Sequence, residues 1–334
     1  ALSSAASDVY KRQHKNRFIM FTKDKCLWVL ISAILGLALP AYGKSNYRPL
    51  RVGCSVTLNE MQYPRLKALK EAGIDCVEIA LTPSPFTREG SSDEAIEARM
   101  AACRQAADSA GIEIWSIHMP FGKTIDLSQS NETIRQKSVA LQLRILDLCR
   151  VLRPHVVLFH PSWYLGHNER PQRMAQLVRS IRELHPRVKK LGAILVIENM
   201  LGYELVKNEQ YERPLGRTVE EVQQIMKQMP RDVYSAIDMN HIDHPERLIR
   251  AMGKRLKSVH ISDGNGRAEC HYMPNPCSGK GDNDWNQILL ELYRAGYSGP
   301  FMYEVGAKEF DEPQELYDCY QNLYQTFIES TQTK

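Results

Sequence analysis

The chain has 334 residues, of which 43% are hydrophobic and 25% charged, a composition that excludes a disordered or fibrous protein and fits one large globular domain. It carries 43 Lys and Arg against 39 Asp and Glu, and residues 1–43 account for the whole surplus of positive charge. The remainder is neutral, so its bulk charge gives no support to a nucleic-acid partner.

The first 43 residues have the pattern of a targeting segment. Residues 1–19 show no structural logic and are interpreted as a non-native leader, whereas residues 20–43 are typical of a signal peptide. Its uncharged run, residues 27–39, is too short to span a bilayer comfortably, and the small residues Ala41 and Gly43 follow. We therefore expect cleavage, a secreted or periplasmic protein, and no stable membrane association afterwards. An uncleaved anchor is the alternative.

Residues 44–334 are predicted to form a single α/β domain. Short apolar runs typical of buried parallel strands alternate eight times with amphipathic, helix-like stretches. The strand candidates are residues 50–57, 75–80, 112–118, 155–160, 194–199, 233–238, 257–262 and 300–305. An open doubly wound sheet usually carries a glycine-rich loop after its first strand, and residues 55–58 contain no glycine. The pattern therefore favours a closed (β/α)₈ TIM barrel.

Helix boundaries are marked by capping signals. Ser91 with Glu94, and Thr218 with Glu221, fit capping boxes at two helix starts. Glycines are expected to end four helices just before strands, and these are Gly73, Gly111, Gly192 and Gly296.

Cysteine usage offers one local hypothesis. Cys270 and Cys277 flank the proline-rich segment HYMPNP, which must be a loop. In an oxidising compartment, we hypothesise a disulfide between these two residues.

Acidic and histidine side chains gather where the predicted strands end. The carboxyl ends of the strands form the active-site face of a TIM barrel, so these residues should share one mouth. They are Glu78, His118, His160, Glu198, Asp238, His241, His260 and Glu304. Any one of them alone is more often a satisfied polar group of the core. Together they predict one divalent metal ion, because burying several carboxylates without a cation is costly. Mixed carboxylate and imidazole ligands suit Mn²⁺, Co²⁺, Zn²⁺ or Mg²⁺.

Seven segments spread over residues 50–305 carry a family resemblance. They are HMPFG (118–122), FHPS (159–162), VIENM (196–200), AIDMNH (236–241), VHISDGNG (259–266), SGKGDNDW (278–285) and GPFMYEV (299–305). In this order they resemble the xylose isomerase-like TIM barrel superfamily, in its sugar phosphate isomerase/epimerase branch. In the ketose 3-epimerases of that superfamily, a Glu, an Asp, a His and a Glu hold one metal ion. The matching positions here are Glu198, Asp238, His260 and Glu304.

The resemblance implies an isomerase or epimerase that enolises a sugar. Glu198 and Glu304 would exchange a proton with a ketose or keto-sugar through an enediolate, beside a metal acting as Lewis acid. Six further residues are expected to contact the substrate, namely His118, His160, His241, Trp163, Lys280 and His271. Basic residues expected at the rim are few, namely Lys123, Arg267 and Lys280, so the expected partner is a small unphosphorylated sugar. A homodimer is left open.

Three alternatives remain open at this stage. A lyase acting on a 3-keto sugar would use the same enediolate. A phosphodiester hydrolase of the apurinic-endonuclease type would need extra ligands, and His118, His160, His241 and the pair Glu269-x-His271 imitate such a set. However, Glu269 stands where those enzymes have Asp. The third alternative is a non-catalytic sugar-binding barrel.

Overall fold

The computed structural model describes residues 47–88, 90–202, 206–208 and 211–332. Within it, residues 47–334 form one compact unit. The predicted leader and signal peptide lie outside the described residues. Among the helices of the described part, none is long and apolar enough to cross a lipid bilayer.

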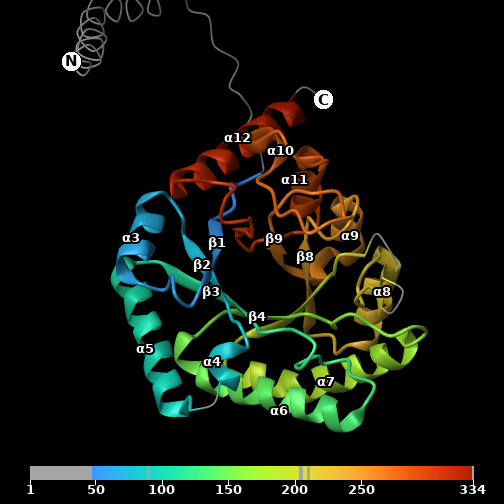
Figure 1. The fold of residues 1–334 in the computed structure, drawn as a ribbon. Coiled ribbons are helices and arrows are strands. Elements are labelled where there is room, and N and C mark those ends of the chain that lie inside the picture. Colours follow the sequence, from blue (N-terminus) through green and yellow to red (C-terminus); the bar gives the residue numbers. More distant parts are fainter. Residues whose placement is uncertain (1–46, 89, 203–205, 209–210, 333–334) are drawn as a thin grey trace, which may run out of the picture. The chain divides into compact units, whose positions relative to one another are not determined.

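Eight parallel strands form a nearly closed barrel, in the order β10-β1-β2-β3-β4-β5-β8-β9 (Figure 1). Their bounds are β1 (Val52–Thr57), β2 (Cys76–Ala80), β3 (Glu113–His118), β4 (Val156–Phe159), β5 (Ile194–Glu198), β8 (Val233–Asp238), β9 (Leu256–His260) and β10 (Phe301–Tyr303). Ile261 completes the ring between β9 and β10, because its N–H donates to Met302 O at 2.7 Å and its carbonyl accepts from Glu304 N at 3.0 Å. The predicted TIM barrel is thus confirmed, and each predicted strand lies within about two residues of an observed one.

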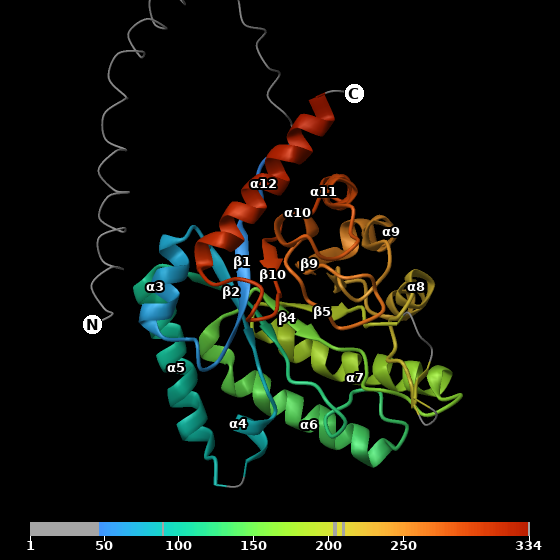
Figure 2. The same cartoon turned by 45° about the horizontal axis from the view of Figure 1, so that its top comes forward.

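Helices surround the strands on the outside of the barrel (Figures 1 and 2). They are α3 (Tyr63–Glu71), α4 (Ser84–Thr87), α5 (Asp93–Ala110), α6 (Glu132–Leu148), α7 (Arg170–Lys190), α8 (Val219–Gln228), α9 (Pro245–Met252), α10 (Asn275–Ser278), α11 (Trp285–Arg294) and α12 (Pro313–Gln332). The helices bury apolar side chains such as Leu66 and Leu184 against the outer face of the strands, which explains why the strands read as continuous apolar runs.

The predicted helix boundaries are largely confirmed. Thr218 caps α8, where its side chain accepts a hydrogen bond from Glu221 N at 3.2 Å. The cap of α5 is Ser92 and not Ser91, because Ser92 Oγ accepts from Ala95 N at 3.2 Å. The four glycines at the predicted helix ends all have φ between 67° and 87°, the left-handed region that only glycine enters without a steric cost.

A short hairpin, which the sequence did not predict, follows β5. Its strands are β6 (Val206–Asn208) and β7 (Tyr211–Glu212). Two backbone hydrogen bonds pair Glu212 with Leu165, at 3.1 and 2.8 Å, and so join the hairpin to the loop after β4. Arg213 and Pro214, which directly follow this hairpin, line the cavity described below.

The predicted disulfide is wrong in its pairing. Cys277 bonds to Cys319 of α12, and Cys270 is a free cysteine. Between Cys270 and Cys277, Tyr272 forms an antiparallel bridge with Asp263, and α10 begins at Asn275. Cys270 N points to Asn240 Oδ1 instead, at 3.3 Å, on the side of the barrel mouth. Cys270 therefore lies beside Asn240, whereas Cys277 lies in α10 beside α12.

Candidate metal centre

The period of two along each strand places the polar residues at the inner rim. Val196 belongs to the small apolar cluster inside the barrel, whereas Leu195 and Ile197 join the core beneath the helices. Glu198 continues the inward series of β5 by two residues, just as Asp238 follows Ala236 on β8. Parallel strands end at one edge, so these side chains meet at the barrel mouth.

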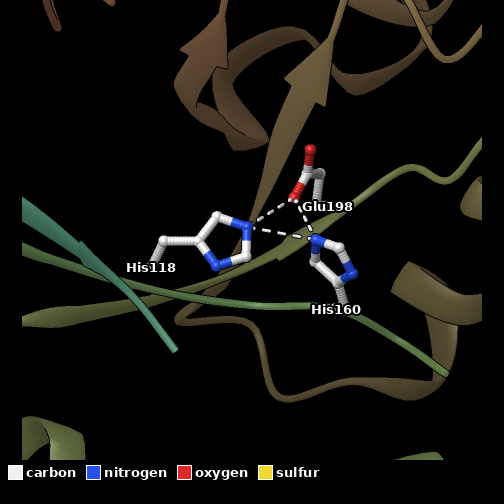
Figure 3. Close-up of side chains that lie close together, drawn as sticks. All are labelled: His118, His160 and Glu198. Carbon is white, nitrogen blue, oxygen red and sulfur yellow. Dashed lines mark hydrogen bonds and ion pairs between the residues drawn. The ribbon is translucent and has the colours of Figure 1, made fainter. Parts of the chain in front are cut away.

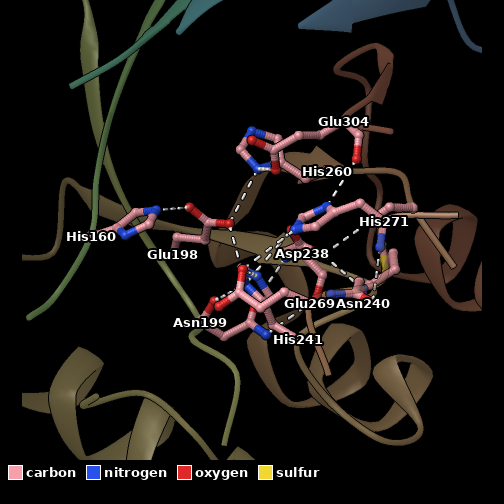
Figure 4. A network of polar contacts seen from close by, with 12 residues as sticks. His160, Glu198, Asn199, Asp238, Asn240, His241, His260, Glu269, His271 and Glu304 are labelled. Carbon is pink, nitrogen blue, oxygen red and sulfur yellow. Dashed lines mark hydrogen bonds and ion pairs between the residues drawn. The ribbon is translucent and has the colours of Figure 1, made fainter. Parts of the chain in front are cut away.

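Four of the predicted ligands converge on one point (Figure 4). Glu198, Asp238, His260 and Glu304 each offer one atom, and these four atoms lie within 4.8 Å of one another. His260 Nδ1 lies 3.2 Å from Glu198 Oε1 and 2.8 Å from Glu304 Oε2. Three of these residues are buried, whereas the side chain of Glu304 is 26% exposed. We call these four residues the central set.

The central set fits a divalent cation by the state of its donor atoms. Asp238 Oδ2 is buried and accepts no hydrogen bond. Burial raises the pKa of Asp238 above its usual value, against the opposing influence of His241 and His271. The surrounding protein alone thus does not compensate this carboxylate, and a cation bound by its free oxygen would. Three carboxylates and one imidazole suit Mn²⁺, Co²⁺, Zn²⁺ or Mg²⁺.

The ring of His260 is held with Nδ1 facing the central set. Its Nε2 lies 2.9 Å from Glu78 Oε1, and Glu78 Oε2 accepts a hydrogen bond from Ser116 Oγ at 2.7 Å. Both Glu78 and His260 are fully buried. A carboxylate behind the second ring nitrogen is the usual support of a metal-binding histidine, because it fixes the tautomer and makes the ring more basic.

A second set of donors shares Glu198 (Figure 3). His160 Nε2 and His118 Nε2 lie 3.1 and 3.5 Å from Glu198 Oε2, and 3.1 Å from each other. His118 Nδ1 lies 3.0 Å from the carbonyl of Met119, so this nitrogen carries a proton, and Nε2 faces the mouth of the barrel. We call His118, His160 and Glu198 the second set.

A third set shares Asp238 with the centre. His241 and His271 each bring a ring nitrogen within 4.8 Å of the other and of the Asp238 carboxylate. The Nδ1 atoms of these histidines face carbonyls, those of Asn199 at 3.1 Å and Glu304 at 3.0 Å. Their Nε2 atoms therefore point to Glu269 Oε2, at 4.0 and 3.8 Å. We call Asp238, His241, His271 and Glu269 the third set.

Two asparagines support these groups, and sequence reasoning gave them no role. Asn199 Oδ1 accepts from Asp238 N at 2.8 Å, and its amide donates to Asp238 O at 3.2 Å. Asn240 Oδ1 accepts from His271 N at 3.4 Å, where the backbone has a φ of 45°. Non-glycine residues adopt this region at a cost, and such residues cluster at functional sites. Both asparagines sit in the quoted segments VIENM and AIDMNH, so the signal was present but unspecific.

Members of all three sets line a cavity of about 470 Å³, which is within the size range of small-molecule sites. They are His118, His160, Glu198, His241, Glu269, His271 and Glu304. The aromatic wall of the cavity consists of Phe121, Trp163 and Tyr164. Phe121 stacks on His160 with ring centroids 3.9 Å apart, and remains 43% exposed. The predicted substrate contacts His118, His160, His241, Trp163 and His271 all line this cavity.

Lys280 is the one predicted contact that the structure places elsewhere. Its ammonium group lies 3.0 Å from Glu309 Oε1 and 5.0 Å from the ring centroid of Tyr272. It does not line the cavity. Two arginines do line it, namely Arg267, a rim candidate from the sequence, and Arg213, which has no sequence signal because it follows the unpredicted hairpin.

The sequence model of one protein family matches residues 66–320, and its description is "Xylose isomerase-like TIM barrel". The chain belongs to this family. Among curated proteins, the uncharacterized protein MJ1614 of Methanocaldococcus jannaschii is 21% identical over 209 residues, which cover 63% of this chain and 76% of that protein.

Several solved structures of this barrel family are sugar epimerases. A D-tagatose 3-epimerase-like protein has a TM-score of 0.63 at 19% identity, over 83% of this chain and 99% of its own. The 3-keto-D-glucoside 4-epimerase of E. coli has a TM-score of 0.61 at 17% identity, with the same coverage. An L-ribulose 3-epimerase has a TM-score of 0.62 at 15% identity, over 84% and 95% of the two chains. At these identities the likeness establishes the fold.

Proposed function

We propose that this protein is a divalent-metal-dependent isomerase or epimerase that acts on a ketose or keto-sugar through an enediolate. One observation carries the proposal: Glu198 at the end of β5 and Glu304 after β10, three strands further round the ring, reach the same nitrogen of His260. Two carboxylates placed around one centre can approach a bound substrate from different faces. The likeness to barrels whose names are those of sugar epimerases supports the same reading.

The chemistry needs a base on each side of one carbon. A metal in the central set would act as a Lewis acid that acidifies the C–H bond next to the substrate carbonyl. Glu198 would remove this proton on one face, and Glu304 would return a proton on the other. Glu304 is suited to this exchange because its carboxylate is the one partly exposed to the cavity. Elimination across a 3-keto sugar would follow from the same enediolate.

The remaining cavity residues would orient the sugar. His118, His160, His241 and His271 present ring nitrogens to the cavity, where they can bind hydroxyl and carbonyl oxygens. The exposed ring of Phe121 and the neighbouring Trp163 offer flat apolar surfaces for a sugar face.

Solvent exchange tests the proposal directly. The metal-loaded protein is incubated in D₂O with D-tagatose, D-psicose, D-fructose, L-ribulose and a 3-keto-D-glucoside, and deuterium at the carbon next to the carbonyl is measured by NMR. We expect incorporation with at least one sugar, and its loss in Glu198→Gln, because an amide does not accept the proton. Glu309→Gln is the matched control, since Glu309 lies outside the cavity. Absence of carbon-bound deuterium with every sugar would contradict the proposal.

A metal-dependent phosphodiester hydrolase is the second candidate, and the second and third sets favour it. They share Glu198 and Asp238 with the central set, as bridging ligands of a metal cluster would. Elemental analysis of the purified protein separates the two functions. An isomerase with one metal gives one equivalent per chain, whereas a cluster hydrolase gives two or three. A hydrolase would also incorporate ¹⁸O from labelled water into its product and leave C–H bonds unexchanged.

Export from the cytoplasm is part of the same proposal. The uncharged run in residues 27–39 supports it, and so does the Cys277–Cys319 bond, because disulfides persist mainly in oxidising compartments. The N-terminal sequence of protein isolated from its host tests this. A start near Lys44 is expected, and a cytoplasmic form that retains residues 20–43 would contradict export.

A further inference from the structure

One buried arginine has no carboxylate partner among the described residues. Three arginines are buried among the described residues, and these are Arg135, Arg173 and Arg213. Arg135 pairs with Glu132 and Glu183, both at 2.8 Å, and Arg173 pairs with Asp126. Arg213 forms no ion pair with any carboxylate of the described residues, although it is only 8% exposed.

The backbone of Arg213 is firmly held at the cavity wall. Arg170 donates to the carbonyl of Arg213 at 2.7 Å and to that of Pro214 at 2.9 Å. Arg170 is itself fixed by two hydrogen bonds to Glu221, at 2.8 and 2.6 Å. The preceding residue, Glu212, pairs with Leu165, which directly follows Trp163 and Tyr164 of the aromatic wall. Arg213 therefore belongs to a rigid part of the site.

The side chain of Arg213 faces the cavity with donors to spare. Its guanidinium lies 6.0 Å from the ring centroid of Tyr164, and one terminal nitrogen is 3.4 Å from Tyr164 Oη. Its Nε is buried and has no hydrogen-bond partner. A guanidinium offers five N–H donors in a planar fork, so most of its capacity is unused.

Burying a cation without a counter-ion is costly, and the cost falls when a ligand supplies the anion. Arg213 lines the same cavity as members of the three sets of metal ligands. A molecule bound over the metal centre therefore lies in the cavity that Arg213 lines. The guanidinium of Arg213 and the metal-ligand sets would then attract different ends of one molecule.

We propose that the substrate carries an oxyanionic group, a carboxylate or a phosphate, and that Arg213 binds it. This rests on the proposed function in that it takes the cavity above the central set as the substrate site. It differs from the sequence-based expectation of an unphosphorylated sugar, which followed from counting basic residues at the rim. A carboxylate matches the planar fork in two parallel hydrogen bonds, and a phosphate can do so as well.

Binding measurements on the metal-loaded full chain test the proposal. Isothermal titration compares D-fructose with D-fructose 6-phosphate and D-fructuronate, which share the ketose and differ in the charged group. We expect at least one anionic sugar to bind about tenfold more tightly than D-fructose. The two anionic probes distinguish a phosphate from a carboxylate. Equal or weaker binding of both would overturn the proposal without any variant being needed.

Variants assign the effect to this residue. Arg213→Gln is expected to abolish the preference for the anionic sugar over D-fructose. Arg213→Lys should restore part of it, more for phosphate than for carboxylate, because an ammonium lacks the fork. Lys280→Gln is the control, since it removes a cation outside the cavity. A preference that persists in a folded Arg213→Gln protein would overturn the proposal.

The readout separates this inference from the proposed function. Binding heat does not depend on C–H exchange. Anion selectivity lost in Arg213→Gln, together with no deuterium exchange, would contradict the enediolate chemistry alone. Deuterium exchange with a ketose, together with no tighter binding of either anionic sugar, would contradict the anion site alone.

Discussion

Glu78 shows how a residue outside the central set can control it. It contacts His260 Nε2 at 2.9 Å and has no exposed surface, so it fixes the ring without reaching the cavity. Glu78→Gln keeps the shape but removes the negative charge behind the imidazole, and it offers Ser116 an amide where an oxygen accepted. We expect metal affinity to fall about 10–100-fold, measured by competition with a chelator.

The matched control is another Glu–His pair on the same barrel. Glu113 Oε1 lies 2.7 Å from His155 Nε2, at the opposite end of β3 and partly exposed. Glu113→Gln should leave metal affinity unchanged. If Glu78→Gln binds metal as tightly as the unaltered protein, His260 is not oriented in the way described.

At the residue scale, the sequence predicted the side chains that strands position and missed those that loops position. Glu198, Asp238 and His260 follow from the period of two and from the end of each strand. Arg213 depends on a hairpin whose strands are two and three residues long, too short for a periodic signal. Lys280 looked like a rim cation, yet an ion pair with Glu309 turns it elsewhere.

At the element scale, Glu221 of α8 links a helix start to the cavity wall. Its carboxylate accepts from the backbone N–H groups of Gly216 and Arg217, at 3.0 and 3.1 Å, and pairs with Arg170. Glu221→Ala leaves Arg170, which is mostly buried, with only the longer ion pair to Glu212, at 3.7 Å. We expect the free energy of unfolding to fall by about 3 kcal/mol, measured by urea denaturation.

Glu220 provides the comparison for this prediction. It is the neighbouring acid in the same first turn of α8, but it is exposed. Glu220→Ala removes only an interaction with the helix dipole, so the loss should be at most about 1 kcal/mol. Equal effects of the two substitutions would show that the contacts of Glu221 add nothing beyond its position in the helix.

The capping-box pattern predicted the start of α8 correctly but not the role of Glu221. In a capping box, the acid at the third position reaches back to the N–H of the cap. Here Glu221 passes Thr218 and accepts from Gly216 and Arg217 instead. The reason is tertiary, since Arg170 from α7 holds the carboxylate in that direction. Such a partner, distant in the sequence, cannot be read from a local pattern.

At the scale of the whole molecule, the fold was predictable because it rests on repetition. Eight apolar runs separated by amphipathic stretches have few arrangements that bury them all, and the barrel is the one that also gathers the polar strand ends. The cross-link was not predictable, because the two cysteines that bond are 42 residues apart in the sequence. Spacing favoured Cys270 as the partner of Cys277, whereas the packing of α10 beside α12 decides for Cys319.

The Cys277–Cys319 bond makes a prediction about the stability of the barrel. It closes a loop that contains α11 and β10, so in the unfolded chain it restricts a long segment that would otherwise be free. The chain-entropy estimate for a loop of this length is about 4 kcal/mol. Cys277→Ser, Cys319→Ser and the double variant should each lose a similar amount in urea denaturation, because any one substitution removes the whole cross-link. Cys270→Ser should change little, since Cys270 is a free cysteine. Peptide mapping without reduction checks the pairing itself: a linked Cys270–Cys277 fragment, or losses that add up in the double variant, would contradict it.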